Sequence, residues 1–321
     1  MRWRGRILLF LLVLLAVFNA GRMAVHETYQ GPGAGKTSKI VVIPPGGTAG
    51  VAETLARAGV IEHPLAFRAA AWLTRQAGPL RAGEYLFPAH ASLAQILGIL
   101  RHGAEVQHQA TIPEGLTGVQ IAAILNALPA ATGQVAPPPE GSVWPQTYNY
   151  VWHTDRAALL ARMQAAERAA LEMAWAGRDP AVPLASPRDA VILASIVQQE
   201  TPLPAEMPVI AAVYENRLKA GMRLQADPTV IYAVTQGRQS GGVTLSKADL
   251  ALASPYNTYQ AKGLPPGPIC APGAAALTAV LHPARSDALY FVAKGDGTHE
   301  SAFSRFFKDQ LGNIERFRAR H

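Results

Sequence analysis

The stretch VILASIVQQET, residues 191–201, decides how the second half of the chain is built. It follows SPRD, residues 186–189, where a serine is followed by proline and, three positions on, by an acidic residue. That pattern is typical of a helix start. Pro202 and Pro204 end the same helix, because proline disfavours helical geometry in the residue before it. The sequence therefore predicts a helix from about Ser186 to Glu200, with an apolar stripe formed by Leu193, Ile196 and Val197.

Glu200 continues this apolar stripe, because it lies three residues after Val197 and four after Ile196. A carboxyl group in that position loses water and lies at the negative end of the helix dipole, and both effects raise its pKa. A carboxylic acid that is protonated near neutral pH can act as a general acid. Glu200 is therefore a candidate general acid/base, and a solvated last-turn glutamate or a helix-end salt bridge is the alternative.

Helical and strand patterns on both sides of this stretch predict an α+β domain. Residues 155–175 are rich in alanine and carry a broad apolar face, and residues 207–220 form a further helix that ends at Gly221. Later segments predict a short helix over 274–281, a strand over 288–294 and a terminal helix over about 304–320.

Two polar clusters follow the predicted helices and are candidates for substrate contact. In MRLQADPTVIYAV, residues 222–234, Gln225 and Asp227 alternate with apolar residues just after a helix ends. In SPYNTYQAKGLPPGPI, residues 254–269, Asn257 and Tyr259 offer an amide and a ring, as sugar-binding sites do. The alternatives are local turn capping by Asp227 and a purely structural connector.

The first third of the chain carries a weak repeat. Three times a strand-like segment ends at a proline and a hydroxyl residue follows four positions later, which predicts helix starts at Thr48, Ser92 and Thr117. Residues 40–87 then have the order strand, helix, helix, strand. This is also the order of LysM modules, which bind glycan chains, but many small α/β units share it.

The N-terminus predicts a membrane anchor. Arg2, Arg4 and Arg6 precede the apolar run Ile7 to Phe18, which reaches spanning length if the helix continues to Val25. We expect an anchor over residues 1–25, with the arginines in the cytoplasm, and a linker over residues 26–39. A cleaved signal peptide is the alternative. A cut after Ala20 would place the bulky Phe18 three residues upstream, which makes a poor cleavage site.

Composition narrows the class of function. The formal net charge of +7 suits an anionic partner. The sequence contains no basic stripe interleaved with aromatic residues, so nucleic acid is not the predicted partner. Cys270 is the one cysteine, so no intrachain disulfide forms, and we expect it to be a small buried side chain. The histidines are scattered, without metal-ligand spacing, so neither a metal nor another cofactor is predicted.

Taken together, several long motifs resemble the endolytic murein transglycosylases of the YceG-like family. The resemblance covers most of residues 38–320, and two positions depart from the family pattern: Gln198, where many members have glutamate, and Glu300, where an aromatic residue is usual. The motifs are TIPEGLTGVQIA (111–122), WPQTY (144–148), LASIVQQET (193–201), NRLKAGMRLQADPTVIYAV (216–234), SPYNTYQAKGLPPGPI (254–269) and HPARSDALYFVAKGDGTH (282–299).

The resemblance implies a small LysM-like α/β module over residues 40–106, followed by an α+β catalytic domain over residues 107–321. It implies a lyase that cleaves peptidoglycan glycan strands, with Glu200 as the catalytic residue. It implies cleavage between N-acetylmuramic acid and N-acetylglucosamine, a 1,6-anhydromuramyl product, and no cofactor. Gln225, Asp227, Asn257 and Tyr259 are then expected to contact the substrate. It also implies a single-pass protein of the bacterial inner membrane whose catalytic domain is periplasmic and which ends strand elongation beside cell-wall synthases.

Two other functions stay open at this level. A muramidase would act on the same bond with water as the nucleophile, and it would need Asp227 as a second carboxylate. A non-catalytic peptidoglycan-binding scaffold would need neither carboxylate.

Overall fold

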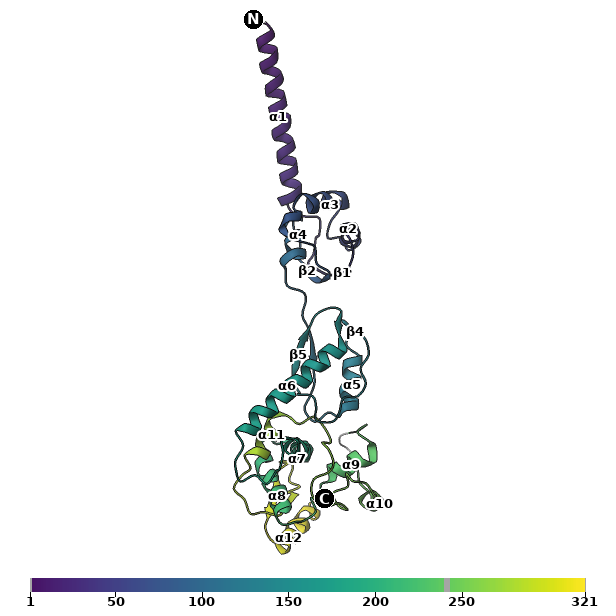
Figure 1. The fold of residues 1–321 in the computed structure, drawn as a ribbon, viewed down its shortest axis with the longest axis vertical. Coiled ribbons are helices and arrows are strands. Elements are labelled where there is room, and N and C mark those ends of the chain that lie inside the picture. Colours follow the sequence, from purple (N-terminus) through teal and green to yellow (C-terminus); the bar gives the residue numbers. More distant parts are fainter. Residues whose placement is uncertain (1, 240–242, 321) are drawn as a thin grey trace. The chain divides into compact units, whose positions relative to one another are not determined.

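In the computed structural model the chain forms two compact units, described here for residues 2–239 and 243–320 (Figure 1). The first unit contains residues 1–108 together with 150–153, and the second contains residues 109–149 together with 154–321. Both units combine helices with short strands, so the predicted α+β class is confirmed.

Helix α1 (Arg2–Gln30) is the one helix among the described residues that is long and apolar enough to cross a membrane. Its large apolar side chains between Ile7 and Phe18 are all exposed, because nothing in the protein packs around them. The helix continues past Val25, where the sequence predicted the anchor to end. By length and composition, α1 is therefore a possible membrane anchor.

The order strand, helix, helix, strand is confirmed in the first unit. Strands β1 and β2 pair antiparallel, with Lys39 opposite Phe87 and Ile43 opposite Gly83. We call residues 39–102 the N-terminal module; its core contains Phe67 and Tyr85, both fully buried. Its elements are β1 (Lys39–Ile43), α2 (Thr48–Arg57), α3 (Pro64–Leu73), the 3₁₀ turn η1 (Arg75–Ala77), β2 (Gly83–Phe87) and α4 (Leu93–His102).

Part of the segment expected to be a linker, residues 26–39, is hydrogen-bonded to this module. Residues up to Gln30 belong to α1, and the chain then runs against the loop before α4. The Gly33 amide donates to the His90 carbonyl at 3.0 Å, and the His90 amide donates to the Gly35 carbonyl at 2.6 Å. A Cβ atom on Gly33 would lie 2.0 Å from the Ala91 carbonyl oxygen, so only glycine permits this approach.

Two of the three predicted helix caps are correct. Ser92 begins α4 and Thr117 begins α5 (Gly118–Asn126), each with a complete capping box. The prediction for Thr48 is wrong by one position, because Gly47 is the N-cap of α2 and no side chain caps that helix.

The second unit is built around α7, which has the predicted bounds and is buried from Ala190 to Val197. Helices α8 and α11 pack against it, and Cys270 lies in the same core, fully buried as expected. The elements are β3 (His108–Thr111), α5, β4 (Ala131–Thr132), β5 (Thr147–Tyr150), β6 (Thr154–Asp155), α6 (Arg156–Ala176), α7 (Pro187–Glu200), α8 (Met207–Lys219), α9 (Asp227–Thr235), α10 (Lys247–Leu250), α11 (Ala274–Leu281), β7 (Tyr290–Ala293), β8 (Ser301–Ser304) and α12 (Phe307–Arg318).

Candidate active site

Glu200 is the last residue of α7, where Thr201 takes up extended geometry and ends the helix. Helix α8 runs against α7 and brings the hydroxyl of Tyr214 to Oε1 of Glu200, to which it donates a hydrogen bond. Tyr214 is itself buried, with its ring edge-on to Phe291 at a centroid distance of 5.9 Å. The carboxyl of Glu200 is therefore held in one orientation, while the residue stays partly accessible to solvent.

Burial raises the pKa of Glu200 from its ordinary value of 4.5 to about 7. The Tyr214 hydrogen bond and the Arg217 charge act in the opposite direction, and the Asp227 charge adds to the rise. A pKa near 7 keeps a substantial fraction of the group protonated at neutral pH, and the group can still give up and regain a proton. This agrees with the desolvation argued from the apolar stripe.

Arg217 fixes the loop that follows α8. Its guanidinium is buried and donates to three backbone carbonyls: Leu289 at 2.7 Å, Leu224 at 2.6 Å and Arg223 at 3.4 Å. Because a buried carbonyl without a donor is costly, these bonds hold residues 223–224 and the start of β7 together. Gln225 comes next, with an exposed side chain and a left-handed backbone (φ +52°).

Asp227 and Tyr259 meet at the start of α9. The Tyr259 hydroxyl donates to Oδ1 of Asp227 at 2.5 Å. Burial and this acceptor raise the pKa of Tyr259 well above its usual range, with a further contribution from the Glu200 charge. The Asp227 charge raises the pKa of Glu200 and the Glu200 charge raises the pKa of Tyr259, so these three side chains lie within electrostatic reach of one another.

Asn257 has a different position from the one expected of a sugar contact. Its side chain is fully buried, and Nδ2 donates to the carbonyls of Leu250 at 3.1 Å and Leu252 at 2.9 Å. Its Oδ1 accepts from the Tyr259 amide at 3.0 Å. Asn257 therefore shapes the loop that carries Tyr259. The direct substrate contact that the sequence predicted for Asn257 does not fit this burial.

Sequence reasoning missed Tyr214 and Arg217. Both lie on α8, three residues apart and hence on one face, and they follow an apolar first half of the helix. That spacing was a usable signal, because a buried arginine and a buried tyrosine hydroxyl each need polar partners.

A second acidic group with a raised pKa lies near the other end of α7. Glu140 lines a hollow of about 840 Å³ together with Glu167, Arg188, Tyr232 and Tyr256, and Glu200 is not among the residues that line it. Burial raises the pKa of Glu140 to about 7. Its Oε2 accepts from the Gly118 amide at 2.8 Å, at the start of α5. Glu140 therefore ties α5 to the edge of this hollow.

The sequence profile of the YceG-like family matches residues 41–316. This chain belongs to the YceG-like family. The match includes both the N-terminal module and the cluster around Glu200, so the family assignment does not depend on the site alone.

Individual relatives agree with this assignment. An endolytic murein transglycosylase of Bacillus subtilis is 42% identical over 125 residues, which is 39% of this chain and 33% of that protein. A protein of the same name from Streptococcus pneumoniae is 27% identical over 292 residues, which is 76% of this chain and 52% of that protein. The YceG-like chain thus spans only about a third to a half of the length of these relatives.

A solved structure is also similar. The crystal structure of a YceG-like protein from Listeria monocytogenes superposes with a TM-score of 0.52 at 27% identity, over 86% of this chain and 99% of that one.

Proposed function

We propose that this YceG-like protein is an endolytic lytic transglycosylase that cleaves peptidoglycan glycan strands, with Glu200 as both acid and base. One observation carries the proposal: a partly accessible carboxyl at the end of a buried helix, oriented by Tyr214, with a pKa of about 7. The names of the Bacillus and Streptococcus relatives support the substrate class.

The reaction begins with Glu200 in its protonated form. It donates its proton to the oxygen that links N-acetylmuramic acid to N-acetylglucosamine, and the bond to muramyl C1 breaks as the ring gains oxocarbenium character. The ionised Glu200 then removes the proton of the C6 hydroxyl of the same ring, and that oxygen attacks C1. The product is a 1,6-anhydromuramyl end, no water is consumed, and Glu200 returns to its protonated form.

The neighbouring groups support a role for one carboxyl rather than two. The Asp227 carboxylate accepts a hydrogen bond from the Tyr259 hydroxyl, which occupies one of its two oxygens. We therefore assign Asp227 and Tyr259, together with the exposed side chain of Gln225, to substrate contact. Asn257 acts indirectly, by holding the loop of Tyr259.

The rest of the chain suits a position at the cell envelope. We propose that α1 anchors the protein in the bacterial inner membrane and that the second unit faces the periplasm, where peptidoglycan lies. Arg2, Arg4 and Arg6, at the start of α1 and before its apolar run, support this orientation through the excess of basic residues on the cytoplasmic side of membrane segments. We further propose that the N-terminal module is LysM-like and binds glycan, and that the enzyme cuts nascent strands beside cell-wall synthases.

The decisive experiment uses the full chain in detergent with nascent glycan strands, followed by mass spectrometry of the products. The parent should release fragments with anhydromuramyl ends, lighter by one water than hydrolysis products, and Glu200→Gln should release none. Asp227→Asn should turn over more slowly and give the same product.

Two results would point elsewhere. Fragments with reducing muramyl ends from the parent would indicate a muramidase that uses Asp227 as its second carboxylate. Strand binding without cleavage, unchanged in Glu200→Gln, would indicate a non-catalytic scaffold.

A further inference from the structure

We infer that the exposed face of α3 lies in the outer interface of the membrane that α1 crosses, where it contacts lipid headgroups and the upper acyl chains. We call this surface the α3 face; it consists of Leu65, Arg68, Trp72, Leu73 and Arg75. The inference rests on α1 as a membrane helix and does not depend on the proposed enzymatic activity.

The α3 face is unusually apolar for a surface that contacts only water. Leu65 is 74% exposed, Trp72 is 64% exposed and Leu73 is 67% exposed. Phe67 and Ala71 on the opposite side of α3 fill the core of the N-terminal module. Trp72 and Leu73 follow Leu65 by seven and eight residues, about two helical turns, so the three side chains lie on one side of the helix. Three large apolar side chains exposed on one side of a ten-residue helix suit an apolar partner, because clustered exposed apolar residues mark contact surfaces.

Two arginines give this surface the character of a membrane interface. Arg68 lies between Leu65 and Trp72, and the Arg75 guanidinium is 4.7 Å from the centroid of the Trp72 ring. A shallow hollow of about 590 Å³ is lined by Leu65, Trp72 and both arginines. Tryptophan beside arginine is enriched at the headgroup level, where the ring is half-solvated and the cation meets anionic lipid. The charge of the α3 face therefore complements an anionic lipid surface.

The position of α3 beside α1 puts this face at the correct height. A hollow of about 610 Å³ separates the last turns of α1 from α3, lined by Arg22, Val25 and Tyr29 on one side and by Ala69 and Leu73 on the other. A bilayer core of about 30 Å takes about 20 helical residues. A span that starts at Ile7 therefore ends near His26, which lines the same hollow. Leu73 thus lies at the level where the hydrocarbon core ends.

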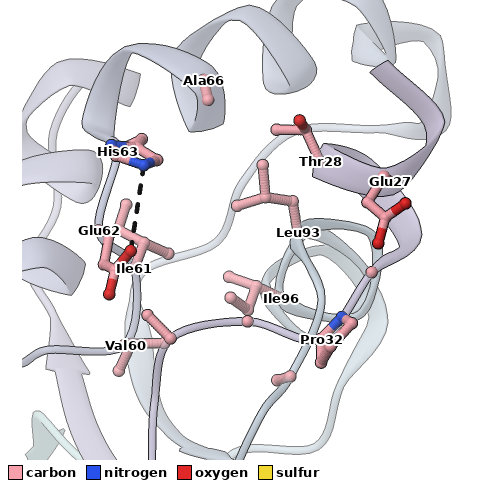
Figure 2. A pocket seen from close by; sticks show the side chains of 14 residues that line it. Glu27, Thr28, Pro32, Val60, Ile61, Glu62, His63, Ala66, Leu93 and Ile96 are labelled. Atoms are coloured by element: carbon pink, nitrogen blue, oxygen red, sulfur yellow. Dashed lines mark ion pairs between the residues drawn. The ribbon is translucent and has the colours of Figure 1, made fainter. Parts of the chain in front are cut away.

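The attachment between α1 and the module keeps α3 at this height. Tyr29 packs against the core of the N-terminal module, and the Gly33 and His90 backbones are hydrogen-bonded. Figure 2 shows Thr28 at the end of α1 near Leu93, which lines the same pocket. These contacts are made by the last residues of the membrane helix and by the residues just after it. The module therefore cannot move far from the bilayer without breaking them.

The test places nitroxide labels on the full chain in vesicles of phosphatidylcholine and phosphatidylglycerol. Leu65→Cys and Leu73→Cys report on the α3 face, Leu14→Cys reports on α1, and Leu86→Cys on strand β2 is the matched control. Leu86 is 54% exposed, and β2 lies at the end of the module away from α1 (Figure 1). Cys270 is buried with a thiol pKa raised to about 12, so it stays unlabelled.

Labels at positions 65 and 73 should collide with dissolved oxygen more often than the label at position 86, and less often than the label at position 14, which lies deeper in the bilayer. Their collisions with a water-soluble nickel chelate should be several-fold fewer than those of the label at position 86. Equal nickel accessibility at positions 65, 73 and 86, with position 14 in lipid, overturns the inference. So does protection at positions 65 and 73 that persists in detergent together with a dimeric mass, because a second copy would then cover the α3 face.

A charge-reversed variant tests the headgroup contact. Arg68→Glu combined with Arg75→Glu should increase the nickel accessibility of the label at position 65 several-fold in vesicles that contain phosphatidylglycerol. In pure phosphatidylcholine the increase should be much smaller. An unchanged accessibility in both lipids contradicts the role of the two arginines. A label at position 14 that is open to the nickel chelate would remove the basis of the inference, whatever the enzymatic activity.

Discussion

The hydroxyl of Tyr214 on α8 donates a hydrogen bond to Oε1 of Glu200 at the end of α7, and this bond opposes the effect of burial on the Glu200 pKa. Burial alone would hold the carboxyl protonated so firmly that it could not easily serve as a base. The tyrosine stabilises the ionised form and thereby keeps the pKa near neutrality. The pair therefore sets the pH range in which one carboxyl can work in both directions.

Replacement of Tyr214 by phenylalanine should raise the pKa of Glu200. A hydrogen bond to a charged group contributes about 1.5–3 kcal/mol, so a rise of about one to two pKa units is expected. The alkaline limb of the pH dependence of kcat/KM for strand cleavage should move upward. Tyr148→Phe is the matched control, because its hydroxyl donates to the Trp144 carbonyl at 2.7 Å and does not contact Glu200. An alkaline limb that stays in place or moves downward contradicts this prediction.

Glu215 predicts a specific pH dependence of stability. Its side chain is 1% exposed, its Oε1 has no hydrogen-bond partner, and burial raises its pKa from 4.5 to about 7. Below pH 4.5 the group is neutral in both the folded and the unfolded chain. Between pH 4.5 and 7 only the unfolded chain ionises, so folding stability falls as the pH rises, by up to about 3 kcal/mol for this group.

Glu215→Gln should remove this loss. Differential scanning calorimetry should show a variant whose advantage over the parent grows from pH 5 to pH 8. Glu315→Gln removes one exposed carboxylate and serves as the control. An advantage for Glu215→Gln that is constant with pH would show that Glu215 ionises in the folded protein as it does in the unfolded chain.

Gly33→Ala should loosen the N-terminal module from α1. The added Cβ would lie 2.0 Å from the Ala91 carbonyl oxygen, so the chain has to move and the hydrogen bond from the Gly33 amide to His90 is lost. We expect faster amide hydrogen exchange over residues 31–35 and 89–91 and a lower melting temperature of the first unit. Gly50→Ala, which meets nothing within 4 Å and lies inside helix α2, should leave both unchanged or increase stability slightly.

Arg217→Lys should fail to replace arginine. Lysine offers a point charge and cannot reach the carbonyls of Leu289, Leu224 and Arg223 together in the geometry of the guanidinium. At least one buried carbonyl is then left without a donor, at a cost of about 1–3 kcal/mol. Urea unfolding measures the loss. The matched change Arg223→Lys, on an exposed side chain, should cost far less, and equal losses for the two variants would refute the role assigned to Arg217.

Helix bounds in the second unit could be predicted closely because the signals are local. The serine cap at Ser186, the proline after it and Pro202 define α7, and the glycine at 221 ends α8 with a left-handed backbone. Caps and proline stops act on residues within one turn, so a sequence contains them in full. The raised pKa of Glu200 also followed from its place on an apolar stripe.

The sequence alone determined that Glu200 ends a buried helix and that the chain begins with an apolar run from Ile7 to Phe18 inside α1. It could not assign Asn257, because a polar residue in a loop can point to solvent or into its own loop, and only the packed backbone decides which. It also could not place Tyr214 opposite Glu200 or Gly33 against Ala91. Those contacts join residues far apart in the chain, and they exist only once the hydrophobic cores have brought the helices and loops together.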